Sequence, residues 1–387
     1  MSEWKEYSLG ELTNWFSGGT PSKEKKEFWN GNIPWISAKT MTNYKVSTSE
    51  LNITEDGLSN GSRLALENDI LLLVRGSGLF IDIPINLVEK PVAFNQDIKA
   101  IRAKKSELQK FIFFWLQGNK KGLNDILEET GIGAGKFDTD LLKKLPILIP
   151  KNRTEFNFIV QTAEVLFDKI DLLHRQNTTL EKMAETLFRQ WFVEEAKEEW
   201  ETMPLSQMAN FLNGLACQKF PPKNEIDKLP VLKIKELSSG ITENSDWAST
   251  EIKPEYIVRN GDVIFAWSAS LMVKIWDGQD CILNQHLFKV TSEDFPKWFY
   301  YLWCKHHLAE FISIAVSHAT TMGHIKRGDL DEAKVLIPRS EELELMSQQV
   351  EPIIEKIITN NNQIRTLTSL RDTLLPKLMN GEVKVEI

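Results

Sequence analysis

The sequence of 387 residues has few cysteines and no long apolar run. Its three cysteines, Cys217, Cys281 and Cys304, are far apart and form no C-x-x-C pair, so neither a disulfide framework nor a zinc site is favoured. A membrane-spanning helix needs about 18 consecutive apolar residues, and no such stretch occurs. The first residues, MSEWKEYSLG, lack the apolar core of a signal peptide. We therefore expect a protein of the reducing cytoplasm without a membrane partner.

Motifs for nucleotide binding and methyl transfer are also missing. The stretch GIGAGKF at residues 131–137 approaches the phosphate-binding loop G-x-x-x-x-G-K-[ST], but its glycine spacing is one residue short and Phe137 replaces the required hydroxyl. The [DNS]-P-P-[YFW] motif of adenine methyltransferases does not occur. The histidines have no nearby acidic cluster, which a metal centre or an acid–base pair would need. We predict that the chain is not an enzyme and itself binds no cofactor or metal.

The charge balance is acidic, with 54 Asp and Glu residues against 46 Lys and Arg residues and a formal net charge of -8. This balance excludes a uniformly basic surface that coats nucleic acid, but it permits a local basic face. With 42% hydrophobic residues, the chain can bury the cores of two or three domains.

The chain contains two copies of one unit. Segments of the first half recur in the second half in the same order, and the offset between them changes only through small deletions. At an offset of 196, WKEYSLGELTNWFSGG from Trp4 matches WETMPLSQMANFLNGL from Trp200; at 193, NDILLLVRGS matches GDVIFAWSAS; at 189, FNQD matches LNQH. We therefore predict copies that cover about residues 1–198 and 199–387.

The first part of each copy has the pattern of an α/β (α+β) domain. Apolar runs at residues 70–74 and 263–267 predict buried strands, bounded by turn signals such as NGN and RNGD. Aromatic-rich stretches, ELQKFIFFWLQG and FPKWFYYLWCKHHLAEFI, predict helices that pack into a core. Each part closes with a strand ending at a proline, so we expect globular domains at residues 1–150 and 199–338.

The second part of each copy, residues 151–198 and 339–387, has the heptad spacing of a coiled coil. The positions that we assign to the seam or to a partner interface are Leu166, Ile170, Leu173, Asn177, Leu180, Leu187, Ile353, Ile357, Asn360, Ile364, Leu367 and Leu374. We expect Asn177 and Asn360 in different layers of the seam, and Pro352 in the first turn of its helix, where proline is tolerated. We predict that the two long helices pair antiparallel, with a globular domain at each end of the rod and a pseudo-twofold internal repeat.

This order of elements resembles the specificity subunit of type I restriction–modification enzymes. The resemblance covers essentially the whole chain and is carried by YSLGELTNWFSGGTPS with IPWISAKT, NDILLLVRGSG, the FNQ and LNQ triplets, ATTMGHIKRGDL, and LIP before each long helix. It implies that each globular domain is a target-recognition domain that reads one half of a bipartite double-stranded DNA sequence. It also implies that the helical rod sets the spacing and docks two modification (methyltransferase) subunits.

Partner subunits would supply the chemistry that this chain lacks. The resemblance implies S-adenosylmethionine in the methyltransferase subunits, and ATP with magnesium in restriction (endonuclease and translocase) subunits that join the complex. The alternative is a DNA-binding regulator or interaction scaffold with the same architecture and no associated methyltransferase.

Several basic residues are candidates for contact with the DNA backbone. Lys23, Lys25 and Lys26 lie in the basic stretch SKEKKEF, which is either phosphate-contacting or simply solvated. Lys39 follows IPWISA in the first copy, and Lys233 and Lys235 occupy the corresponding stretch of the second.

Other candidates could read bases. Arg75 ends an apolar strand and could bond guanine, with a surface salt bridge as the equal alternative. Asn95, Gln96, Asn284 and Gln285 could bond adenine, but both copies keep them, which favours turns braced by side-chain amides. The copies differ most in the loop that begins GIGAGKF in the first copy and ATTMGHI in the second, which we call the variable tip. This tip adds four candidates for which we favour DNA contact: Lys136, His324, Lys326 and Arg327.

Overall fold

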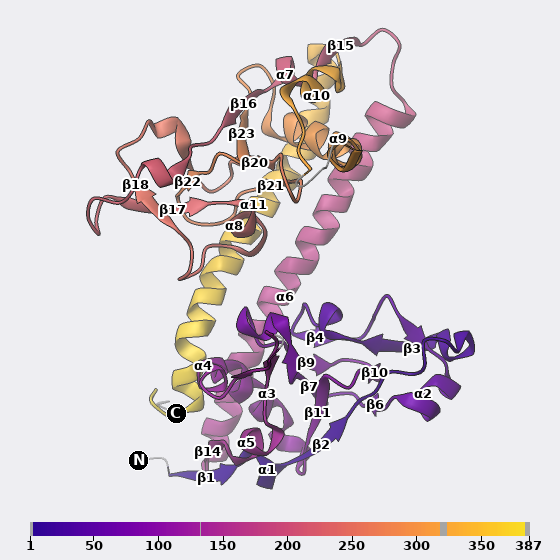
Figure 1. Cartoon of the computed structure of the whole chain (residues 1–387), viewed down its shortest axis with the longest axis vertical. Coiled ribbons are helices and arrows are strands. Elements are labelled where there is room, and N and C mark those ends of the chain that lie inside the picture. The colour runs from indigo at the N-terminus through magenta and orange to yellow at the C-terminus, as the bar shows by residue number, and fades with distance from the viewer. Residues whose placement is uncertain (1–2, 132, 318–322, 384–387) are drawn as a thin grey trace. The chain divides into compact units, whose positions relative to one another are not determined.

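The computed structural model describes residues 3–131, 133–317 and 323–383. The chain divides into two compact units (Figure 1), unit 1 with residues 1–172 and 366–387 and unit 2 with residues 173–365. Each unit contains one β-rich domain and one segment of each of two long helices, α6 (Arg153–Arg189) and α11 (Ser340–Met379). Among the described helices, none is long and apolar enough to cross a membrane.

Two main sheets lie in the domain of unit 1. The larger has the strand order β2-β11-β7-β9-β4, and the smaller has the order β5-β3-β10-β6. Their strands are β2 (Thr13–Ser17), β3 (Trp29–Ile36), β4 (Lys45–Val46), β5 (Asn52–Ile53), β6 (Leu64–Ala65), β7 (Ile70–Leu73), β9 (Ile85–Val88), β10 (Val92–Phe94) and β11 (Ile98–Ala103). The apolar run predicted as a strand is β7, which lies in the middle of the larger sheet with all four residues buried.

The domain of unit 2 repeats this topology. Its sheets have the strand orders β16-β23-β20-β21 and β18-β17-β22-β19. Their strands are β16 (Asn210–Asn213), β17 (Lys228–Leu232), β18 (Trp247–Ser249), β19 (Ile257–Val258), β20 (Val263–Ala266), β21 (Met272–Ile275), β22 (Cys281–Leu283) and β23 (Leu287–Thr291). The second predicted strand is β20, which holds the same place as β7 and is also fully buried.

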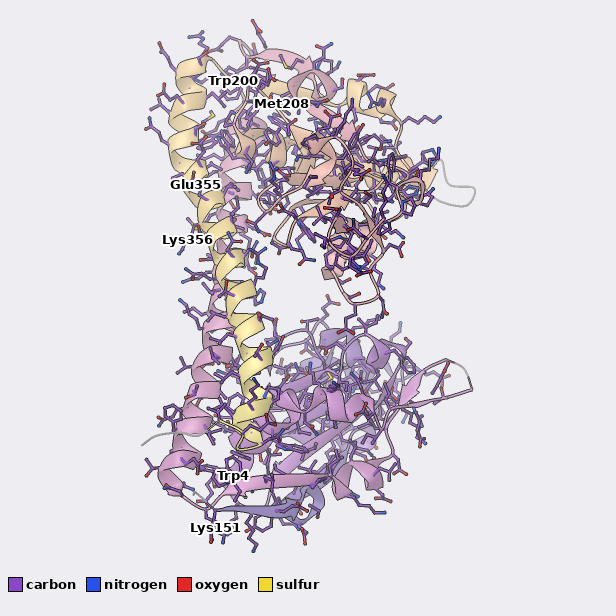
Figure 2. The ribbon with its side chains drawn as sticks, turned by 90° about the vertical axis from the view of Figure 1, so that its left-hand side faces the viewer. Trp4, Lys151, Trp200, Met208, Glu355 and Lys356 are labelled. Atoms are coloured by element: carbon purple, nitrogen blue, oxygen red, sulfur yellow. The ribbon has the colours of Figure 1, made fainter. Side chains whose placement is uncertain are left out.

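A short antiparallel pair of strands completes each domain. In unit 1, β1 (Trp4–Ser8) pairs with β14 (Pro146–Pro150); in unit 2, β15 (Glu201–Pro204) pairs with β24 (Lys334–Ile337). Trp4 opens the first pair and Trp200 precedes the second, and both are labelled in Figure 2. The indole N–H of Trp200 donates to Oε2 of Glu342 on α11 at 2.8 Å, which ties this pair to the long helix of its own unit.

The strand register confirms the internal repeat residue by residue. In the parallel pair β3–β10, Trp35 lies opposite Ala93, and in the parallel pair β17–β22, Val231 lies opposite Ile282. Equivalent partners therefore differ by 196 and 189, which are the offsets read from the sequence. Two copies that place matched residues in matched register have the same fold.

The aromatic-rich stretches form helices at the centre of each core, as predicted. The helices of the domains are α1 (Leu9–Leu12), α2 (Glu55–Gly61), α3 (Gln109–Gly118), α4 (Lys120–Asn124), α5 (Thr139–Lys144), α7 (Leu205–Met208), α8 (Ile234–Ser239), α9 (Lys297–Ser317) and α10 (Arg327–Glu332). In unit 1, the ring centroids of Phe114 on α3 and Phe167 on α6 are 5.3 Å apart. In unit 2, those of Trp303 on α9 and Phe188 on α6 are 4.9 Å apart. In each unit, α6 therefore packs against the domain core through aromatic rings.

The two long helices run antiparallel within unit 2. Asn177 of α6 is hydrogen-bonded to Asn360 of α11. The ring of Trp298 on α9 lies edge-on to the ring of Trp191, which is in the π-helical turn after α6. The indole N–H of Trp298 donates a hydrogen bond to the hydroxyl of Ser347 on α11. Later residues of α6 thus meet earlier residues of α11. In unit 1, the guanidinium of Arg371 on α11 likewise lies over the ring of Phe167 on α6, at 5.2 Å.

Two details of the helix prediction were wrong. Asn177 and Asn360 share one layer, because they bond directly rather than lying in different layers. Pro352 is not in the first turn, because α11 begins at Ser340, twelve residues earlier. The apolar pattern used to place the helix start fails there, since the first turns of α11 are rich in glutamate.

The buried face of each long helix is wider than the predicted seam. Of the twelve seam positions, Ile170, Leu173, Asn177, Ile357 and Asn360 are buried, and the others are partly buried. Neighbouring residues outside the seam are buried as well: Phe167, Phe188, Ile354 and Leu375. A helix that packs on a partner helix and on a globular core needs a broader apolar stripe than a simple two-stranded coiled coil.

Candidate nucleic-acid interface

Arg75 and Lys136 lie opposite each other in a small sheet of unit 1. Arg75 belongs to β8 (Arg75–Gly76) and Lys136 to β13 (Gly135–Lys136), and the antiparallel pairing of these strands sets the two residues side by side. Both side chains are exposed. Within the described residues neither cation has an ion-pair partner, so the salt bridge kept as the alternative for Arg75 is not formed. Two adjacent unpaired cations suit a polyanionic ligand.

The buried neighbours of these cations hold them in place. Phe137 is buried, and its backbone N–H donates to the carbonyl of Val74 at 2.9 Å. On the other edge of β13, the strand β12 (Glu128–Glu129) places Glu128 opposite Lys136. The backbone of the small sheet therefore positions the cations.

The second copy contains the same bridge with different residues. Ser268 pairs antiparallel with His324, and the backbone N–H of Ile325 donates to the carbonyl of Trp267 at 3.1 Å, as Phe137 does to Val74. The ring centroids of His324 and Trp267 are 6.2 Å apart. Residues 318–322, which belong to this variable tip, lie outside the described residues.

The asparagines predicted as possible adenine readers serve as braces. Asn95 is 8% exposed and Asn284 is 5% exposed. The side-chain oxygen of Asn95 accepts from the backbone N–H of Asp97 at 3.1 Å, and that of Asn284 accepts from the backbone N–H of His286 at 3.3 Å. This geometry supports the turn-bracing alternative and gives no support to base contact by these two residues.

The neighbouring glutamines lie nearer the surface. Gln96 is exposed and Gln285 is partly buried. Oε1 of Gln96 accepts from Thr20 at 2.6 Å, and Nε2 of Gln285 lies 3.4 Å from Nε2 of His286. The glutamine of each pair, rather than the asparagine, is therefore the more accessible amide.

The lysine candidates differ in how free their charges are. Lys233 forms an ion pair with Asp246, and the ammonium of Lys25 lies 5.0 Å from the ring centroid of Phe28. The remaining basic candidates are exposed and have no ion-pair partner in the described part of the chain: Lys23, Lys26, Lys39, Lys235, Lys326 and Arg327. Lys326 is the N-cap of α10 and Arg327 is its first residue, two and three residues after His324.

Sequence comparison shows why the same frame occurs twice. The profile of the type I restriction modification DNA specificity domain matches residues 1–182 and, a second time, residues 197–369. The chain belongs to this family. It is therefore a DNA specificity subunit of a type I restriction–modification system, and subunits of this family are non-catalytic.

Individual relatives agree with this assignment. The chain is 27% identical over 99% of its length to the type I restriction enzyme MjaIX specificity subunit of Methanocaldococcus jannaschii, of which it covers 94%. It is 38% identical over 173 residues to the EcoR124I/EcoR124II specificity subunit of Escherichia coli, which is 44% of this chain and 41% of that protein. In fold, it is similar to the crystal structure of a type I restriction–modification S subunit from M. genitalium, with a TM-score of 0.58, 14% identity, and coverage of 100% of this chain and 97% of that chain.

Two buried cysteines and two neighbouring histidines of α9 have properties that follow from their surroundings in this specificity subunit. Burial raises the pKa of the thiols of Cys281 and Cys304, so neither is a reactive thiolate. Nε2 of His307 lies 2.9 Å from the carbonyl oxygen of Lys334 and serves as a packing contact. Burial, aided by the neighbouring His307, lowers the pKa of His306. Within the described residues, no group of three His, Cys, Asp or Glu side chains could hold a metal ion.

Sequence reasoning missed the direct pairing of Arg75 with Lys136. They are 61 positions apart, and only the small sheet brings them together. A usable signal was present: their counterparts in the second copy, Ser268 and His324, are both changed. When two positions both carry different residues in the two copies, they are candidates for one common role that each copy fills with different side chains.

Proposed function

We propose that the two domains of this specificity subunit each read one half of a bipartite double-stranded DNA target. The target-recognition domains would be residues 1–150 and 199–338, with residues 151–198 and 339–387 forming the helical spacer. The observation that carries this proposal is the bridge that recurs with different residues, Arg75 with Lys136 and Ser268 with His324. Two domains that share one backbone arrangement but carry different side chains on it can read different half-sites.

The side chains at the two bridges offer different chemistry to DNA. The guanidinium of Arg75 can donate two hydrogen bonds to O6 and N7 of guanine, and Lys136 beside it can hold a phosphate or a second base edge. Ser268 and His324 offer a hydroxyl and an imidazole, which suit other base edges. The exposed lysines near residues 23–26 would contact phosphates and thereby position the domain.

The partners follow from the lack of catalytic motifs in this chain. We propose that α6 and α11 dock two methyltransferase subunits, which would hold S-adenosylmethionine and methylate adenine at the chosen site. Restriction subunits, using ATP and magnesium, would join the same complex. Exposed side chains such as Glu355 and Lys356, which Figure 2 labels on α11, are available to such partners.

The test is methylation by the purified chain with and without its methyltransferase partner. The chain alone should neither methylate nor cleave DNA, and the complex should methylate adenine at one bipartite sequence. Exchanging residues 1–150 for the same domain of a relative should change one half of that sequence only. Site-specific methylation or cleavage by the isolated chain, or a change in both halves after one exchange, would contradict the proposal.

A further inference from the structure

The connection between β7 and β9 is longer in the first copy than its counterpart in the second. Leu72 pairs with Ile85 across these strands, and the equivalent partners in the second copy are Phe265 and Val273. Twelve residues separate the first two and seven separate the second two, so the first copy carries five additional residues. The longer connection contains the short helical turn η3 (Ser77–Phe80).

This longer connection exposes two adjacent apolar side chains. Phe80 is 51% exposed and Ile81 is 81% exposed. Their neighbours Leu79 and Ile83 are buried in the core of unit 1. Isolated exposed apolar residues are common, but Phe80 and Ile81 are consecutive in a turn whose other apolar residues, Leu79 and Ile83, are buried.

The backbone of this turn is fixed. The N–H groups of Ile81 and Asp82 both donate to the carbonyl of Gly78, at 2.9 and 3.2 Å. The carboxylate of Asp82 is paired with the ammonium of Lys120 at 2.6 Å. The two apolar side chains are therefore presented by an anchored loop, and little conformational entropy is lost when they meet a ligand.

The turn lies directly beside the cation pair. It begins immediately after Arg75 and Gly76 of β8, and it packs on β13, since a side chain at Gly135 would place its Cβ 2.9 Å from Cβ of Leu79. The turn that carries the two apolar side chains therefore adjoins the strands that hold Arg75 and Lys136. The ligand of a DNA specificity subunit is DNA, a polyanion that also carries apolar groups on its base edges.

Resting on the proposed function, we infer that Phe80 and Ile81 read thymine in the half-site of the first domain by contacting its C5 methyl group. The methyl group of thymine is the apolar feature of base edges in the major groove, and apolar side chains recognise it there. A patch of two side chains is too small to dock a protein, whose stable interfaces bury roughly 800 Å² on each partner. The second copy has the shorter connection, so it lacks this contact.

Uracil substitution tests the inference, because uracil lacks only the methyl group. The complex of this chain with its methyltransferase partner is given duplexes in which each thymine of the first half-site is replaced in turn by uracil. At one thymine or more, the rate of adenine methylation should fall roughly fourfold, as expected for one buried methyl group. In the complex with Phe80→Ala and Ile81→Ala, the rate on thymine should fall and the ratio of thymine to uracil rates should approach one.

Ile226→Ala provides the matched control, since Ile226 is 88% exposed in the second copy. It should preserve the ratio of thymine to uracil rates in the first half-site. An unchanged melting temperature of the double variant would show that it is folded, as its exposed positions predict. A first half-site without thymine, equal rates on thymine and uracil in the unchanged complex, or a ratio that survives the double substitution would each overturn the inference. In all three cases methylation remains site-specific; its complete absence in the unchanged complex would instead refute the proposed function, and the inference with it.

Discussion

The side-chain amide of Asn360 donates a hydrogen bond to the side-chain oxygen of Asn177 at 2.9 Å, between the two long helices of unit 2. The amide of Asn177 in turn donates to the side-chain oxygen of Asn361 at 2.6 Å. Asn177 and Asn360 are buried, at 8% and 0% exposure. A buried amide is costly unless it is bonded, so a helix shift that separates these residues is disfavoured. The pair therefore fixes the register of α6 against α11.

Replacing one member of this pair should cost more than replacing both. Asn177→Leu leaves the buried amide of Asn360 without its acceptor, and we expect the free energy of unfolding to fall by roughly 1–3 kcal/mol. The double variant Asn177→Leu with Asn360→Leu should recover most of that loss, because two apolar side chains replace two amides. Urea unfolding of the full chain measures both. A single variant as stable as the unchanged chain would contradict this role.

An acidic pH should weaken the contact between β4 and α6 in unit 1. The ammonium of Lys45 lies 2.7 Å from the carboxylate of Asp168, and the hydroxyl of Tyr44 donates to the same oxygen. Burial opposes ionisation of Asp168, but the hydrogen bonds from Lys45 and Tyr44 lower its pKa overall. Because the folded pKa lies below the unfolded value of about 3.9, the stabilisation is complete above that value and is lost as pH falls through the folded pKa.

The corresponding variant is Asp168→Asn. The ion pair is partly exposed, with side-chain exposures of 29% for Lys45 and 45% for Asp168, so its loss should cost at most about 1 kcal/mol at pH 7. The stability difference from the unchanged chain should shrink below pH 4. Thermal unfolding at pH 7 and pH 3 checks this; a difference that stays constant over the two pH values would show that the charge of Asp168 contributes nothing.

Removing the cation at Arg75 should affect one half-site only. Given the proposed function, Arg75→Ala should relax the specificity of the half-site read by the first domain and cost roughly 1–3 kcal/mol in DNA binding. Lys136→Ala should weaken binding in the same domain. Lys90→Ala, which removes an exposed charge from the turn after β9, is the control for net charge. Methylation of a randomised target library is the measurement. Unchanged affinity and specificity after Arg75→Ala would exclude base contact by this residue.

Lengthening both long helices should lengthen the DNA spacer between the half-sites. One heptad inserted at matched positions of α6 and α11 keeps the seam in register and adds about 10 Å of helix. At about 3.4 Å per base pair, the preferred spacer should grow by about three base pairs. Those pairs also rotate the second half-site by roughly 100°, so part of the activity should be lost even at the best spacer.

The control for this experiment is a heptad in one helix alone, which should be more harmful because it leaves seam residues unpaired. Methylation is measured over a series of spacer lengths. An extended protein that remains folded and active on the original spacer would show that the helices do not set the distance.

Local residue patterns were sufficient to predict much of the fold. The strands β7 and β20 lie where continuous apolar runs predicted them, because a buried strand selects apolar residues on both faces. The repeat was also readable, since the two copies keep similar residue types in the same order at offsets that change only through small deletions. The place of Pro352 within α11 was not readable, because glutamates in the first turns interrupt the apolar spacing, although Met346 there is buried.

The sequence by itself determined the two copies, the long helices and the buried strands, since those depend on neighbours a few residues apart. Only the tertiary structure decided which distant side chains meet. Asn177 reaches Asn360 across 183 positions, and Arg75 reaches Lys136 because β8 and β13 pair. It also separated Asn95, which is buried as a brace, from Gln96 beside it, which is exposed. Such outcomes depend on strand pairing and on which face of a turn the core covers, and residue spacing along the chain does not specify either.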